Sequence, residues 1–176
     1  MVLELLNKIT TNNYLHSLII LAIFFAISQL SVFISKRIIL RLTKKTKTDI
    51  DDLIVAKTSK PISLILLLIG IRLAIIPHKI RADILDIVEH AIVSLVMVIA
   101  TYIAIVVFNI IISNWGRKFA SRTESRIDDE VVNLFQKFAR IILSFIGLIF
   151  ILDVWGIKVG PLLASLGIAG LAVAFA

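Results

Sequence analysis

Two pairs of adjacent aspartates, Asp51-Asp52 and Asp128-Asp129, are the side chains whose type and spacing come closest to acid–base chemistry. Two carboxylates can act as a general acid and a general base when both reach the same substrate. Neighbouring residues on a helix point about 100° apart, however, so neither pair forms a preorganised dyad. We therefore predict no catalytic residues, and we expect that the protein is not an enzyme.

The start of a helix explains both acidic pairs. Thr48 and Ser125 each precede the first aspartate of a pair by three residues. A hydroxyl at this position can accept a hydrogen bond from the third amide of a helix, and an acidic side chain in the first turn interacts favourably with the helix dipole. The sequence therefore predicts that one helix begins at each pair.

Metal and cofactor chemistry has little support in the sequence. The three histidines, His16, His78 and His90, are far apart, and the chain contains no cysteine. Protein metal sites need several ligands close together, and the motifs that cradle phosphates or zinc are not found. We expect neither a metal site nor a bound cofactor.

The elements that would carry these residues are apolar enough to span a bilayer. The chain is 59% hydrophobic, with a mean hydropathy of +1.02, whereas ordinary soluble domains are roughly 45–50% apolar. Residues 15–35, 91–112 and 159–176 carry no charge, and about 20 apolar residues span a bilayer core. Shorter apolar runs lie at 62–76 and 138–152. We predict an all-α membrane protein with five transmembrane helices.

The positive charges gather in two segments between the predicted helices. Residues 36–60 hold eight Lys and Arg residues and 113–137 hold five, whereas 77–90 hold two. Because basic loops stay in the cytoplasm, we expect the N-terminus outside the cell and the C-terminus inside. The net charge of +7 then serves topology, and we expect no nucleic-acid partner.

A repeat with an offset of 77 residues organises the chain. Residues 47–70 and 124–147 share nine identities, which include the aspartate pairs, one lysine and one glycine. Repeated segments of this kind indicate repeated structural units. We predict a first helical hairpin at 1–76, a second at 77–155 and a separate helix from 156 to 176.

The last segment differs from the others because nine of the 17 residues at 160–176 are Gly, Ala or Ser. Small residues let helix backbones approach closely in lipid. At 3.6 residues per turn, Leu171 and Phe175 share a stripe with Ala164 and Gly167. Its flanks hold Ala169, Gly170, Ala172, Ala174 and Ala176. This pattern fits a ring of identical helices around a narrow pore, and it fits a helix buried in a monomeric bundle equally well.

Several basic residues are candidates for contact with lipid. Arg72 and Arg140 lie within apolar segments near their ends, where long side chains can reach the headgroups. We predict that both face lipid and that loop lysines contact anionic headgroups: Lys44, Lys45 and Lys47. These lysines would equally serve topology alone.

Residues 166–176, which follow a turn between Gly156 and Gly160, resemble the pore helix of the small-conductance mechanosensitive (MscS-like) channels. The resemblance lies in the alternation of glycine and alanine, and the preceding hairpins are similar to those of the longer members. It implies a homo-oligomer, usually a heptamer, in a bacterial plasma membrane. The last helix would line the pore, and the hairpins would act as tension-sensing paddles.

The resemblance also implies roles for single residues. Leu171 and Phe175 would form two gate rings, and neighbouring pore helices would pack through Ala164, Gly167, Gly170, Ala172 and Ala174. Two positions depart from the family pattern: Ala174 stands where some members have a third glycine, and Ile168 where some have alanine. The family continues beyond this motif into a cytoplasmic β-domain, so we expect a chain truncated within the pore helix.

The function that these features predict is a channel that opens under membrane tension and releases ions and small osmolytes after hypo-osmotic shock. The alternative is a non-conducting membrane scaffold or a transporter module built from repeated hairpins. Transporters of that kind tend to have broken helices and buried charges at the membrane centre. The apolar segments here contain no acidic residue at their centres.

Overall fold

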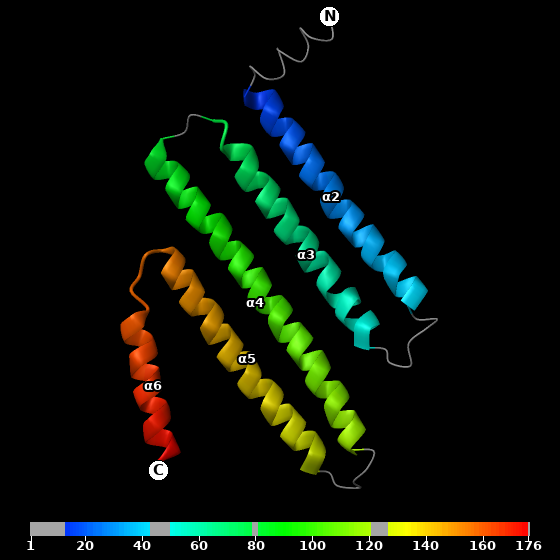
Figure 1. Ribbon diagram of the computed structural model, residues 1–176, viewed down its shortest axis with the longest axis vertical. Coiled ribbons are helices and arrows are strands. Elements are labelled where there is room, and N and C mark those ends of the chain that lie inside the picture. Colours follow the sequence, from blue (N-terminus) through cyan, green and yellow to red (C-terminus); the bar gives the residue numbers. More distant parts are fainter. Residues whose placement is uncertain (1–12, 43–49, 79–80, 121–126, 176) are drawn as a thin grey trace, which may run out of the picture.

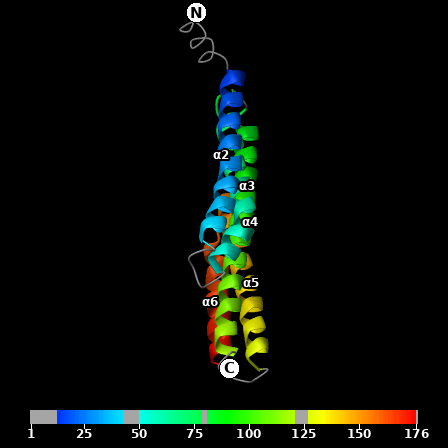
Figure 2. The same cartoon turned by 90° about the vertical axis from the view of Figure 1, so that its right-hand side faces the viewer.

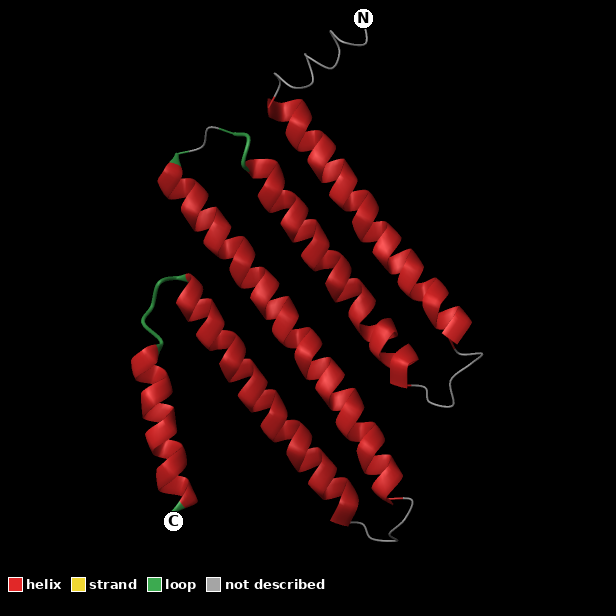
Figure 3. Cartoon of the chain, viewed as in Figure 1, coloured by secondary structure: helices red, strands yellow, loops and turns green. Residues whose placement is uncertain are grey.

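The structure, a computed structural model, describes residues 13–42, 50–78, 81–120 and 127–175. Five helices account for most of these residues: α2 (Asn13–Leu42), α3 (Ile50–Ile75), α4 (Ala82–Ala120), α5 (Ile127–Val154) and α6 (Gly160–Ala174). No strand occurs in these ranges, as Figure 3 shows. The predicted all-α fold is therefore confirmed.

The first four helices form a layer that is one helix thick. Consecutive helices run antiparallel, and α2 packs against α3, α3 against α4, and α4 against α5 (Figure 1). Seen edge-on, the same helices overlap in a narrow band (Figure 2). The description of α6 is different, because the described part of this helix packs against none of the other four.

A layer of this kind cannot enclose a core. Among the described residues, only Ala74, Ile92 and Ile110 are buried apolar side chains, whereas large ones such as Phe25 (55%) and Phe138 (56%) are exposed. Such extensive apolar exposure is unfavourable in water. It is favourable in lipid, so the fold is that of a membrane protein.

Three helices are long and apolar enough to cross a bilayer. The candidate spans are Asn13–Ser35, Ile50–Ile75 and Ala82–Asn114, and a shorter apolar helix covers Gly160–Ala172. A bilayer core of about 30 Å needs about 20 helical residues. The protein is therefore a multi-pass membrane protein, and the spans predicted within α5 and α6 stay predictions.

The acidic pairs lie at helix starts. α3 begins at Ile50 with Asp51 and Asp52 in its first turn, and α5 begins at Ile127, directly before the second pair. The predicted capping hydroxyls of Thr48 and Ser125 lie outside the described residues.

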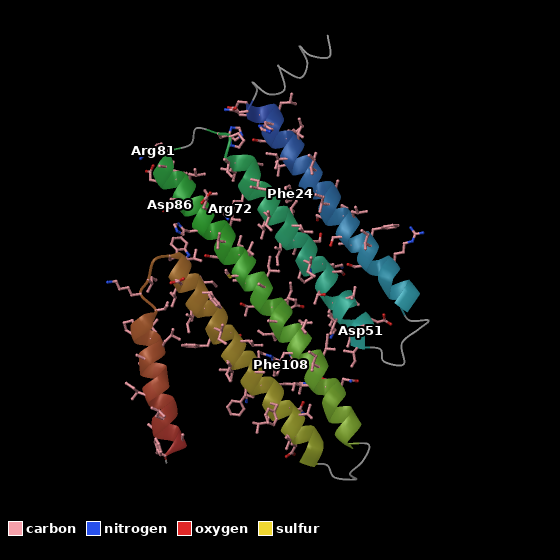
Figure 4. The ribbon with its side chains drawn as sticks, in the orientation of Figure 1. Phe24, Asp51, Arg72, Arg81, Asp86 and Phe108 are labelled. Carbon is pink, nitrogen blue, oxygen red and sulfur yellow. The ribbon has the colours of Figure 1, made fainter. Side chains whose placement is uncertain are left out.

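Each hairpin has one point of close approach between its two helices. In the first, Gly70 of α3 lies against Phe24 of α2 (Figure 4), and a Cβ atom at Gly70 would stand 2.8 Å from the Phe24 Cγ. In the second, a Cβ atom at Gly147 of α5 would stand 2.9 Å from the Thr101 Cγ2 of α4. Gly147 and Thr101 each follow their counterpart by 77 residues, so both hairpins use one packing register.

A hydrogen bond joins the helices at the open end of each hairpin, opposite the turn that links them. Ser17 Oγ donates to the Ala74 carbonyl at 2.5 Å and shares a hydrogen bond of 3.1 Å with His78 Nε2. Trp155 Nε1 donates to Ser94 Oγ at 2.9 Å. Ser94 and Trp155 again follow Ser17 and His78 by 77 residues. The offset seen in the sequence therefore recurs in the contacts.

Candidate pore-lining helix

A tight turn carries the chain from α5 into α6. Gly156 has a φ of 71°, a left-handed conformation that glycine adopts without steric cost. The Gly156 amide donates to the Asp153 carbonyl at 2.9 Å, and the Ile157 amide donates to the Leu152 carbonyl at 3.0 Å. This pair of bonds is the Schellman motif that commonly ends a helix. α6 then starts with a proline in its first turn, where proline costs no hydrogen bond.

The two predicted gate residues lie one turn apart on the same face of α6. The Phe175 amide donates to the Leu171 carbonyl at 3.1 Å, as expected for residues four apart on a helix. Leu171 is 59% exposed and Phe175 is 88% exposed. No part of the described chain therefore covers this stripe.

The small residues of α6 are equally uncovered. A Cβ atom at Gly167 or Gly170 would meet nothing within 4 Å, and Ala164, Ala172 and Ala174 are exposed. The flanks that were predicted to pack against neighbouring pore helices thus contact no other described helix of the same chain. Their packing role stays a prediction.

The predicted lipid-facing charges have different surroundings. Arg72 Nη2 lies 3.5 Å from Glu89 Oε2 on α4, with side chains 46% and 35% exposed. Arg140 is exposed on α5. Lys44, Lys45 and Lys47 lie outside the described residues. Lipid contact therefore stays a prediction for all five, and the pairing of Arg72 with Glu89 was not predicted from the sequence.

Polar side chains join neighbouring helices inside the layer. Ser28 Oγ and Ser63 Oγ share a hydrogen bond of 2.6 Å between α2 and α3, and Gln136 Nε2 of α5 donates to Ser113 Oγ of α4 at 2.6 Å. Hydrogen bonds of this kind hold transmembrane helices together in lipid. No sequence pattern indicated these pairs, because serine and glutamine also occur singly on such helices.

The residues first considered for chemistry do not converge. His78 is bonded to Ser17 at one hairpin end, while the His90 ring lies against Trp155 with centroids 5.6 Å apart. In the part of the chain that the structure describes, no three His, Cys, Asp or Glu side chains gather as metal ligands would. The arrangement instead presents an uncovered, small-residue helix beside a membrane-embedded layer.

Comparison with known proteins gives this arrangement a family. The family model described as "Mechanosensitive ion channel, transmembrane helices 2/3" matches residues 137–176, which lie in α5 and α6. The large-conductance mechanosensitive channel MscMJLR of Methanocaldococcus jannaschii is 29% identical over 100% of this chain and 49% of its own length. The chain belongs to the MscS-like family of mechanosensitive channels.

Two further relatives of this MscS-like chain agree. The small-conductance mechanosensitive channel MscMJ of the same organism is 28% identical over 88% of the chain and 46% of its own length. An uncharacterized MscS family protein of Aquifex aeolicus is 29% identical over 84% of the chain and 39% of its own length. No solved structure matches. The MscS-like chain thus spans about half the length of the curated relatives, and relatives named as channels support a role other than catalysis.

Proposed function

We propose that this MscS-like chain is the transmembrane part of a channel that opens under membrane tension and releases ions and small osmolytes on hypo-osmotic shock. The observation that carries this proposal is α6, which is rich in small residues and packs against none of the other described helices. Small residues favour close contact between helices in lipid. A helix of this kind needs partners, and copies of itself supply them.

In this proposal the partners are identical subunits, seven by the family resemblance. The flanks of α6 that hold Gly167, Gly170 and Ala172 contact the neighbouring copies, so Leu171 and Phe175 point toward the axis. Apolar rings around a narrow passage exclude water and close it. The exposure of both side chains in the single chain supports this placement.

The four-helix layer serves as the tension sensor. Residues 1–76 and 77–155 form two copies of one hairpin, and residues from 156 onward start the pore helix. The contacts that recur at an offset of 77 support this division. Tension favours the wider state of such an assembly because that state occupies more membrane area. The layer exposes its apolar faces to the lipid that transmits the tension.

The proposed orientation places the N-terminus outside a plasma membrane and the C-terminus in the cytoplasm. It rests on the positive charge of residues 36–60 and 113–137. Lys44, Lys45 and Lys47 then face the cytoplasmic leaflet, where each basic residue near anionic lipid contributes about 1 kcal/mol.

Patch recording of the full-length protein in liposomes tests this proposal. We expect suction to evoke currents, and we expect the threshold tension to change when anionic lipid is removed because the basic loops lose their headgroup contacts. Protein-free liposomes are the control. Absence of suction-evoked current would contradict channel function and favour a non-conducting scaffold or transporter module. A threshold independent of anionic lipid would contradict only the lipid contact.

A further inference from the structure

The junction between the two hairpins differs in chemistry from the contacts inside each hairpin. Inside the hairpins, the helices are held by glycine packing and by hydrogen bonds from Ser17 and to Ser94. Between the hairpins, α3 packs against α4, and the ion pair of Arg72 with Glu89 joins these two helices (Figure 4). Within the described ranges it is the only ion pair that links two different helices.

The position of this ion pair gives it mechanical leverage. Arg72 lies in the last turn of α3, and Glu89 lies seven residues after the start of α4 at Ala82. The connection between α3 and α4 fixes only the helix ends. A second attachment further along the helices resists their rotation about that connection.

The same turn of α4 also contacts the second hairpin's other helix. His90, next to Glu89, stacks on Trp155 at the end of α5, and Trp155 donates its hydrogen bond to Ser94. Adjacent residues of α4 thus reach α3 on one side and the end of α5 on the other. A displacement of the first hairpin is thereby transmitted across the layer.

The next junction along the chain lacks such an attachment. At the offset of 77, the counterparts of Arg72 and Glu89 are Ile149 and Leu166, so the junction between α5 and α6 carries no charge pair at these positions. The described part of α6 packs against none of the other helices. One junction is therefore fixed by an ion pair, and the following junction is left free.

We propose that the Arg72–Glu89 ion pair clips the two hairpins into one unit that moves as a whole relative to α6. This inference deepens the proposed function, on which it rests for the meaning of the motion. Separating the two charges near lipid leaves each without a partner in a poorly solvating environment, so separation is unfavourable. The first hairpin then follows the second instead of swinging independently.

Distance measurements between spin labels test the clip directly. The chain has no cysteine, so cysteines introduced at the lipid-exposed positions Leu18 of α2 and Leu95 of α4 are the only labelling sites. Labelled full-length protein is mixed with an excess of unlabelled protein in lipid nanodiscs, so that distances within one subunit dominate. We expect a narrow distance distribution for the native ion pair.

Breaking the ion pair should shift this distribution to longer distances and broaden it. Arg72→Gln removes the attraction and Arg72→Glu adds repulsion, so the second should have the larger effect. The exchanged variant Arg72→Glu with Glu89→Arg should restore the native distribution. Arg140→Glu makes the same charge change on α5 without breaking an ion pair, and it should leave the distribution unchanged.

An unchanged distribution in Arg72→Glu, or failure of the exchanged variant to restore it while the protein still inserts, would overturn the clip. This measurement requires no current. Loss of tension-evoked current in the unaltered protein would therefore contradict the proposed function and leave the distance result to decide the clip.

Discussion

Full-length protein that carries Phe175→Ser or Leu171→Ser is expected to open at lower tension than the unaltered protein, and its expression should slow cell growth by solute leakage. The two side chains share one stripe of α6 and are exposed in the single chain. Transfer of an unbonded hydroxyl to an apolar environment costs about 1–3 kcal/mol, so a serine at the ring favours water in the constriction by a comparable amount per copy. Patch recording gives the threshold.

A serine at Ala172 provides the matched control for these variants. Ala172 is also exposed on α6 but lies about 100° round the helix from Leu171, on a flank proposed to contact a neighbouring subunit. Ala172→Ser should alter packing without wetting the passage. If Phe175→Ser and Ala172→Ser shifted the threshold equally, the stripe would not face a pore.

Gly70→Leu is expected to destabilise the first hairpin by about 1–3 kcal/mol, the usual cost of forcing extra atoms into a packed contact. The cause is the approach of Gly70 to Phe24, which leaves no room for a side chain. Loss of helical circular dichroism on titration with denaturing detergent measures the change.

Removal of the opposing ring tests the cause of that effect. The double variant Phe24→Ala with Gly70→Leu makes space at the contact and should recover much of the stability lost in Gly70→Leu. A single variant as stable as the unaltered protein would contradict the close approach. A double variant no better than the single one would place the strain elsewhere.

The helices could be predicted from the sequence because their causes are local. Uncharged apolar runs and the acidic pairs indicated the number of helices and the starts of α3 and α5. The repeat with an offset of 77 indicated two hairpins, and the same offset relates the contacts of Gly70 and Gly147.

The partners across helix interfaces could not be predicted in this way. The contact of Arg72 with Glu89 depends on how far α3 and α4 slide along each other, and a helical pattern is unchanged by such a slide. The same applies to Ser28 and Ser63. For α6, the pattern of small residues indicated close packing, but the surfaces proposed to cover it belong to other copies of the chain.

Cysteine modification under tension tests most directly whether α6 lines a tension-gated pore. Leu171→Cys places a thiol on the proposed pore stripe, and Leu162→Cys places one nine residues earlier, about half a turn round the helix. With no native cysteine to react, a charged thiol reagent should block suction-evoked current in Leu171→Cys and leave Leu162→Cys unaffected. Block of Leu162→Cys alone, or the absence of suction-evoked current in the unaltered protein, would contradict the account.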